Sequence, residues 1–282
     1  MLGNILSYLG KEEEMTVMEL FSLTDRVAVV TGGAGKLGSQ MCDALAEAGA
    51  HVVVASRNLA NCQRKAAALS ELHAEAFAVQ ADVTEPDQVQ SMTDAVRDKF
   101  GRIDVLVNNA YSGAGAGVPF EDLTLEYWEA AAQGALHSTF LCSQAASKVM
   151  KKQNGGVIVN IASFYGVISP DHRIYGESGI NNPPEYGAVK AGIIQFTRWL
   201  ATYLAPNNIR VNSIAPGGFY NEEFTDRPDY EEVFVSGYNH RTPLGRMGND
   251  TDLKGTVVFL GSDASAWTTG QNLVVDGGWT AW

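Results

Sequence analysis

The chain has 282 residues, of which 45% are hydrophobic and 18% are charged, and its formal net charge is −12 at pH 7. A chain of this length and composition forms one large globular domain or two small ones, each with a packed core. The negative charge argues against a nucleic-acid partner, because phosphate binding requires a basic surface.

The first 20 residues differ from the rest of the chain. Residues 1–10 are mostly apolar, but they lack basic residues, and an acidic run follows at 12–14. This is not the pattern of a secretory signal, and the apolar run is too short to span a bilayer. We therefore expect residues 1–20 to form a flexible extension, with Met15 or Met18 as alternative start sites. Residues 21–282 are expected to form a single domain that does not bind a membrane.

From residue 21 onward, short runs rich in Val and Ile alternate with longer stretches rich in Ala, Leu, Gln and Lys. The short runs are predicted strands buried on both faces, and the longer stretches are predicted helices. The predicted strands are 26–31, 51–56, 76–80, 103–108, 157–161, 209–214 and 273–275. The predicted helices are 37–48, 59–72, 87–100, 125–151, 185–204 and one after Asp250. This order implies a doubly wound parallel α/β sheet with helices on both faces.

A glycine-rich loop follows the first predicted strand and opens the first predicted helix. Residues 31–38 read T-G-G-A-G-K-L-G. Glycines permit a tight turn and let backbone N–H groups approach a pyrophosphate, and the helix N-terminus favours the anion. A glycine motif in this position predicts a dinucleotide site. Its candidate residues are Gly32, Gly35, Lys36, Leu37 and Gly38.

The end of the second predicted strand bears on the choice of cofactor. An enzyme that prefers NAD usually carries an acidic residue there, which binds the ribose 2′-OH. This chain carries Ser56 and Arg57 instead, and a hydroxyl beside a guanidinium suits a 2′-phosphate. Lys36 adds positive charge. We therefore predict NADP as the cofactor, with NAD as the alternative if Arg57 is only a solvated surface residue.

Tyr186 and Lys190 are the candidate proton-transfer residues. Their i, i+4 spacing places both side chains on one face of a helix. An isolated tyrosine has a pKa near 10, and a nearby ammonium group lowers that pKa. Tyr186 could then donate a proton to a carbonyl oxygen or accept one from an alcohol. Ser163 follows the predicted strand 157–161 and could hydrogen-bond the same oxygen.

Taken together, these motifs resemble the short-chain dehydrogenase/reductase family over residues 21 to 282. The resemblance rests on segments 31–38, 82–83, 108–110, 186–190, 216–217 and 275–278 and on Ser163. It implies a Rossmann fold with a seven-stranded sheet, and usually a homotetramer. It also implies that Lys190 contacts the nicotinamide ribose and that Phe219 lies near the carboxamide. Further cofactor-binding residues implied by the family are Asp82, Val83, Asn109 and Ala110.

The chain departs from the family pattern at three places. Lys36 stands where classical members commonly have glycine. Ser163 and Tyr186 are 23 positions apart, which indicates a polar insertion within 167–184; Tyr175 lies at the customary distance but has Gly179, not Lys, four residues later. The catalytic asparagine of the family falls at Ala135, where His137 or Gln133 could substitute, although helix packing is the commoner role for both.

These observations predict an NADP(H)-dependent oxidoreductase that transfers a hydride between nicotinamide and a carbonyl or secondary alcohol. The polar insertion and the C-terminal tail favour a small polar substrate such as a sugar, polyol or sugar acid, with Arg173 as the ligand for an anionic group. The alternatives are a 3-oxoacyl or ketone reductase and a dinucleotide-binding regulator without catalysis. Three cysteines without a C-x-x-C pair are typical of the cytoplasm, and the five histidines lack metal-ligand spacing, so no metal is expected.

Overall fold

Seven parallel strands form one sheet in the order β3-β2-β1-β4-β5-β6-β7. The computed structural model describes residues 15–282, apart from 73–74, 177–180 and 228. The strands are β1 (Val27–Thr31), β2 (His51–Ser56), β3 (Ala76–Gln80), β4 (Val105–Asn108), β5 (Gly156–Ile161), β6 (Ile209–Pro216) and β7 (Asn272–Val275). The chain winds outward from β1 to β3, returns to the other side of β1 and continues to β7. This topology confirms the predicted doubly wound sheet.

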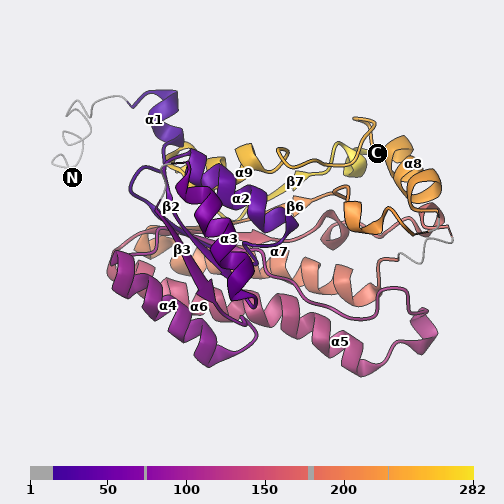
Figure 1. The fold of residues 1–282 in the computed structure, drawn as a ribbon, viewed down its shortest axis with the longest axis horizontal. Coiled ribbons are helices and arrows are strands. Elements are labelled where there is room, and N and C mark those ends of the chain that lie inside the picture. The colour runs from indigo at the N-terminus through magenta and orange to yellow at the C-terminus, as the bar shows by residue number, and fades with distance from the viewer. Residues whose placement is uncertain (1–14, 73–74, 177–180, 228) are drawn as a thin grey trace, which may run out of the picture.

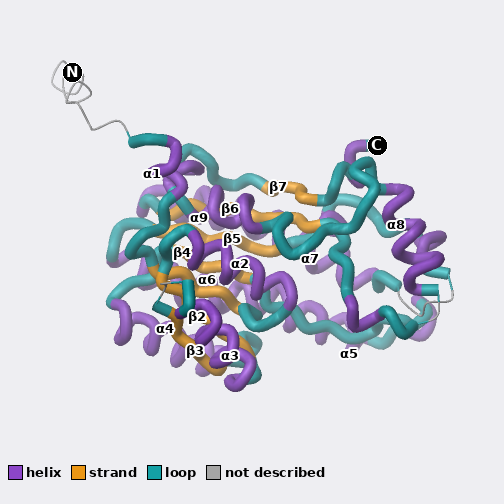
Figure 2. The backbone as a smooth tube through the Cα atoms, turned by 45° about the horizontal axis from the view of Figure 1, so that its top comes forward, coloured by secondary structure: helices purple, strands orange, loops and turns teal. Residues whose placement is uncertain are grey.

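Helices cover both faces of the sheet (Figures 1 and 2). They are α1 (Val17–Phe21), α2 (Lys36–Glu47), α3 (Leu59–Ser70), α4 (Pro86–Phe100), α5 (Leu125–Ala131), α6 (Ser138–Lys152), α7 (Pro184–Leu204), α8 (Ser236–Arg241) and α9 (Lys254–Gly261). One buried cluster joins the sheet to α2, α3 and α9. A second cluster joins the opposite face to α4, α6 and α7. The core therefore consists of two layers of side chains, one on each face of the sheet.

Strand β1 shows why the short Val-rich runs were correctly predicted. All five of its residues are buried, and it pairs with β2 on one edge and β4 on the other. The predicted strand began one residue earlier, at Arg26. That residue is instead paired with Asp104 and Asp263 at the rim of the sheet, because its guanidinium must stay near water.

The predicted helix 125–151 is interrupted. A π-helix, Ala132–His137, separates α5 from α6. At its centre lies Gly134, where an added Cβ would sit 1.8 Å from the carbonyl oxygen of Ser112. The loop after β4 therefore rests directly on the helix backbone at this point, and π-bulges of this kind often occur at functional sites.

Two segments outside the predicted helices contain helices. Residues 217–249 include a π-helix at Tyr230–Val235 followed by α8. The predicted boundary at residue 20 falls inside α1, which begins with a capping box between Thr16 and Glu19. In Figure 1, α8 and the C-terminus lie at the opposite end of the molecule from α1.

Candidate active site

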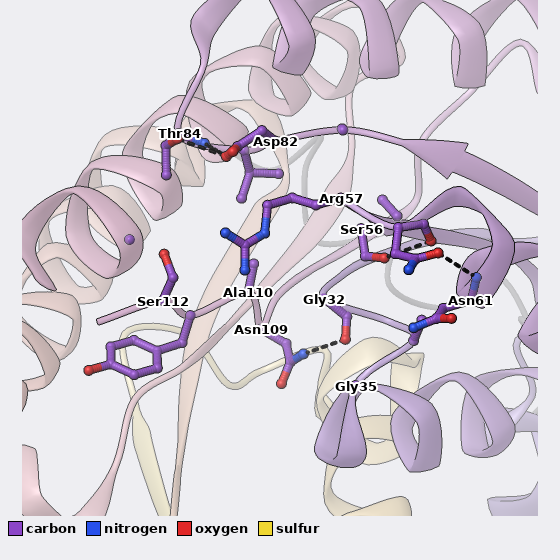
Figure 3. A pocket seen from close by; sticks show the side chains of 18 of the residues that line it. Gly32, Gly35, Ser56, Arg57, Asn61, Asp82, Thr84, Asn109, Ala110 and Ser112 are labelled. Atoms are coloured by element: carbon purple, nitrogen blue, oxygen red, sulfur yellow. Dashed lines mark hydrogen bonds between the residues drawn. The ribbon is translucent and has the colours of Figure 1, made fainter. Parts of the chain in front are cut away.

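A cleft of 480 Å³ opens at the carboxyl ends of β1, β2 and β4, beside the glycine-rich loop (Figure 3). This is the edge of a doubly wound sheet where ligands usually bind. Eleven of the predicted cofactor residues line this one cleft: Gly32, Gly35, Lys36, Leu37, Gly38, Ser56, Arg57, Asp82, Val83, Asn109 and Ala110. The structure thus brings together residues that are up to 78 positions apart in the chain.

The backbone of the loop is shaped for a close approach by a ligand. Gly32 has a positive φ of 63°, and an added Cβ at Gly38 would lie 2.1 Å from the Gly32 oxygen. Asn109 holds the loop in place, because its Nδ2 donates to the oxygens of Thr31 and Gly32 at 3.0 and 3.2 Å. Helix α2 begins directly after Gly35 without a side-chain cap. Its first N–H groups have no intrahelical acceptor and can bind a phosphate.

At the far end of the cleft, Arg57 is exposed and extends between Asp82 and Ala110 in Figure 3. The Asp82 carboxylate accepts hydrogen bonds from Thr84, which lower its pKa, and the charge of Arg57 lowers that pKa further. Ser56 lies at the end of β2, with its Oγ 3.0 Å from the Cys62 sulfur. No acidic residue stands where β2 ends. The cleft therefore carries a guanidinium at the end of β2, where enzymes that prefer NAD usually carry an acidic residue.

The three candidate catalytic residues come from two neighbouring elements. Ser163 follows β5 and accepts a hydrogen bond from the Tyr165 amide at 3.2 Å, which fixes its side chain. Tyr186 and Lys190 lie one turn apart on α7. Ser163 and Tyr186 line the same cavity of 180 Å³, together with Phe219. Lys190 is buried behind them.

The electrostatics of this group differ from the prediction. The Lys190 ammonium donates to the Ile161 carbonyl at 2.8 Å, and burial lowers the pKa of Lys190 to about 8. Burial raises the pKa of Tyr186, and the hydrogen bond with Ser163 only partly offsets this. The expected lowering of the Tyr186 pKa by Lys190 is therefore not found, because desolvation is the larger effect. Tyr186 is protonated at neutral pH and can donate a hydrogen bond.

Tyr111 is a site residue that the sequence analysis missed. Its ring lies 5.2 Å from the Tyr186 ring in an edge-to-face arrangement, and the Lys190 ammonium lies 5.3 Å from its centre. Tyr111 lines the cofactor cleft, yet the cleft and the Ser163–Tyr186 cavity share no lining residue in the described part of the chain. Tyr111 therefore stands between the two. A bulky residue directly after Asn109-Ala110 was the available sequence signal.

The substrate side of the site is aromatic, which the polar character of the insertion did not predict. Eight aromatic side chains besides Tyr186 line the cavity: Phe164, Tyr165, Tyr175, Phe219, Phe224, Tyr230, Phe234 and Tyr238. They come from segments far apart in the sequence, including the π-helix Tyr230–Val235. From the insertion itself, Asn181 and Asn182 also line the cavity, whereas Glu177 lies outside the described residues.

Arg173 does not line this cavity or the neighbouring cavity that contains His172. Its side chain is 82% exposed and forms an ion pair with Asp171 at 2.8 Å. Asp171 also pairs with Arg241, and these hydrogen bonds and charges hold the pKa of its carboxyl well below the usual range. The Arg173 guanidinium is therefore already paired, and it lies outside the cavity that Tyr186 lines.

Ala135 is buried in an apolar cluster with Ala131, Ala162, Val189 and Ile193. The two substitutes considered for the missing asparagine, His137 and Gln133, are both exposed. Neither therefore replaces an amide at the buried position of Ala135. Among the described residues, no group of three or more His, Cys, Asp and Glu side chains could hold a metal ion. None of the helices in that part of the chain has the length and apolar character to cross a membrane.

Comparisons with known proteins agree with this geometry. A family model described as enoyl-(acyl carrier protein) reductase matches residues 32–280. A 3-oxoacyl-[acyl-carrier-protein] reductase from Synechocystis sp. is 39% identical over 262 residues, which cover 91% of this chain and 98% of that protein. A short-chain type dehydrogenase/reductase from Mycobacterium marinum has a TM-score of 0.83 at 32% identity, covering 95% of this chain and 100% of its own. A gluconate 5-dehydrogenase from Burkholderia cenocepacia, solved with NADP and tartrate, has a TM-score of 0.84 at 30% identity, with coverage of 95% and 100%.

Proposed function

Because the chain belongs to the short-chain dehydrogenase/reductase family, we propose that it uses NADP(H) to interconvert a carbonyl group and a secondary alcohol. The observation that carries this proposal is the placement of Ser163 and Tyr186 in one cavity, with Lys190 behind them. Tyr111 stands between this cavity and the cofactor cleft, whose far end is formed by Arg57. The arrangement supplies an acid/base group beside a dinucleotide site.

The chemistry of the protein groups follows from their contacts. When bound, the nicotinamide ring supplies or accepts the hydride. In the reducing direction, Tyr186 donates its phenolic proton to the substrate oxygen, and its raised pKa keeps that proton available at neutral pH. Ser163 holds the same oxygen by a hydrogen bond. Lys190 is fixed by Ile161, and its ammonium stabilises negative charge on Tyr186 after the proton has left.

The fit of NADP rests on the cleft itself. The glycine loop leaves space that a Cβ would fill, and α2 presents free N–H groups to a pyrophosphate. Arg57 is positioned for a 2′-phosphate, since a guanidinium binds phosphate oxygens in a bidentate manner. That the related gluconate 5-dehydrogenase was solved with NADP supports the same choice. NAD remains the second candidate.

The lining of the cavity and the related proteins bear on the substrate class that we propose. The related gluconate dehydrogenase supports a sugar-acid substrate, and the 3-oxoacyl reductase supports a ketone. In this chain Arg173 is exposed and paired with Asp171, so the described residues of the cavity include no cation that could bind the carboxylate of a sugar acid. The aromatic lining favours the ketone alternative. A regulator without catalysis is the least favoured function, because Ser163, Tyr186 and Lys190 are all in place.

The proposal can be tested with purified full-length chain and a panel of ketones, sugars and polyols, followed by nicotinamide absorbance. We expect turnover with NADPH or NADP and at least one panel member. If NADPH binds but no carbonyl compound is reduced, even in a single turnover, the regulator function replaces the enzymatic one. We further propose the homotetramer that the family resemblance implies, which light scattering on the same preparation checks.

A further inference from the structure

We propose that the Ser163–Tyr186 cavity binds an uncharged carbonyl compound that carries a ring, and that it rejects anionic substrates of the same shape. This inference rests on the proposed function and specifies its substrate class. It follows from four properties of the cavity: the hydrogen bonds of its tyrosines, the stacking of its rings, the charges around it, and one acceptor that has no partner among the described residues.

The tyrosine hydroxyls in the cavity wall are bound to the protein. The hydroxyls of Tyr165 and Tyr175 are 3.2 Å apart and hydrogen-bond each other. The Tyr230 hydroxyl accepts from the Asn221 amide at 3.0 Å, and the Tyr238 hydroxyl accepts from the Gly218 amide. The hydroxyls therefore position the rings, and the rings are what the wall offers to a substrate.

The rings form a connected stack. Phe234 lies 5.6 Å from Tyr175 and 5.7 Å from Tyr230, and both pairs are nearly parallel. Phe164 stacks on Tyr165 at 4.1 Å. Stacked aromatic side chains bury a flat apolar ring well, whereas a sugar would leave several hydroxyl groups without partners, at a cost for each. The wall therefore matches a ring-bearing substrate better than a polyol.

The charges around the cavity oppose an anion. None of its described lining residues is Lys, Arg, Asp or Glu. One wall comes from residues 221–235, a segment with six carboxylates and one arginine. An anionic substrate in the cavity would lie beside this acidic segment and would lose its hydration without a cation among the described lining residues.

One hydrogen-bonding group of the lining remains available. The Oδ1 of Asn182 is buried and has no hydrogen-bond partner within the described residues. In contrast, Asn181 is engaged on both sides, with the Gly117 amide at 2.6 Å and the Val118 oxygen at 3.3 Å. A buried acceptor left unpaired in the wall of a cavity favours a ligand with a matching donor. The cavity thus has room for one donor group on an otherwise apolar substrate.

A charge series on a constant ring tests the proposal. Acetophenone, methyl 4-acetylbenzoate and 4-acetylbenzoate share one carbonyl and one ring, but only the last is an anion. We expect kcat/KM with NADPH to be at least about 100-fold lower for the carboxylate than for its methyl ester, because the charge is buried unpaired. Equal or better turnover of the carboxylate would overturn the proposal. So would a higher kcat/KM for D-fructose than for acetophenone.

A variant pair tests the role of the rings. Phe234→Leu keeps an apolar side chain but removes one aromatic ring from the stack. The matched control is Phe140→Leu, because Phe140 is half-exposed on α6 and does not line the cavity. We expect Phe234→Leu to raise KM for acetophenone by about 2- to 12-fold, the range for one aromatic pair, with little change for butanone. The control should change neither. An equal effect on both ketones would show a merely structural role and contradict the proposal.

Binding without turnover separates this inference from the proposed function. The alcohol products 1-phenylethanol and 4-(1-hydroxyethyl)benzoate can be compared on Tyr186→Phe by saturation-transfer NMR. If wild-type chain reduces carbonyl compounds but prefers the anion, the inference fails and the proposed function stands. If no carbonyl is reduced, yet the neutral alcohol binds and the anion does not, the inference stands and the proposed function fails.

Discussion

Removal of the Arg57 guanidinium should weaken the binding of NADPH far more than that of NADH. Arg57 lies at the end of the cofactor cleft, and one hydrogen bond to a charged group contributes about 1.5–3 kcal/mol. At about 1.36 kcal/mol for each tenfold change, Arg57→Leu should raise the Kd for NADPH by roughly 13- to 160-fold. The lower part of that range is expected, because Arg57 is exposed and also interacts with the Asp82 carboxylate.

Fluorescence titration of the purified variant with both cofactors measures this effect. The matched control is Arg64→Leu, since Arg64 is an exposed arginine on α3 that bonds Asn61 and does not line the cleft. The control removes the same charge and should leave both affinities near wild type. The double change Ser56→Asp with Arg57→Leu should then shift preference toward NADH, because a carboxylate accepts a hydrogen bond from the ribose 2′-OH. Equal losses for both cofactors in Arg57→Leu, or a wild-type chain that already prefers NADH, would refute the reasoning.

Three further predictions concern the buried end of the site. Tyr186→Phe should reduce kcat by at least about 100-fold while NADPH still binds, since only the proton donor is removed; near-normal turnover would contradict the assignment. Lys190→Met should stabilise the fold by about 1–3 kcal/mol at pH 7, because a buried ammonium with a pKa near 8 is replaced. This gain in stability should shrink between pH 8 and pH 10, because in that range the lysine of the unfolded chain is still protonated while Lys190 in the folded protein is not. Urea titrations of both proteins at pH 8 and pH 10 measure the change. A gain that stays constant would contradict the prediction. Because Tyr111 stands between the cofactor cleft and the Ser163–Tyr186 cavity, we expect it to slow the entry of the nicotinamide. Tyr111→Gly should therefore speed the association of NADPH by about 2- to 12-fold, given the loss of one aromatic pair with Tyr186, while Tyr111→Phe should keep the wild-type rate. Identical stopped-flow rates in all three proteins would exclude this role.

The sheet and the cofactor loop could be predicted from local sequence because their signals are local. A strand buried on both faces needs an unbroken apolar run, and β1 shows such a run in residues 27–30 and buries all five of its residues. The turn before α2 needs glycine, because a Cβ at Gly38 would collide with the Gly32 oxygen. The i, i+4 spacing of Tyr186 and Lys190 likewise fixes their common face on α7. Each of these features follows from residues within one element.

The substrate cavity and its electrostatics could not be predicted in this way. The rings around Tyr186 come from loops, short 3₁₀-helices, a π-helix and α8. In the sequence, each of these residues looks like an ordinary apolar residue. The polarity of residues 167–184 suggested a polar pocket, but the exposed Arg173 side chain pairs with Asp171 instead. Only the packing of distant segments decided which side chains face the substrate.

The pKa values of Tyr186 and Lys190 likewise depend partly on the sequence and partly on the tertiary structure. The sequence determined that an ammonium group lies one helical turn from Tyr186, and the charge of a lysine favours a phenolate. The tertiary structure decided the outcome, because it buries both groups and directs the ammonium to Ile161. Desolvation depends on everything packed around a group, not on its neighbours in the chain. The sequence therefore determined the fold and indicated which residues we propose as the acid/base group, whereas their protonation and the form of the pocket depend on the assembled core.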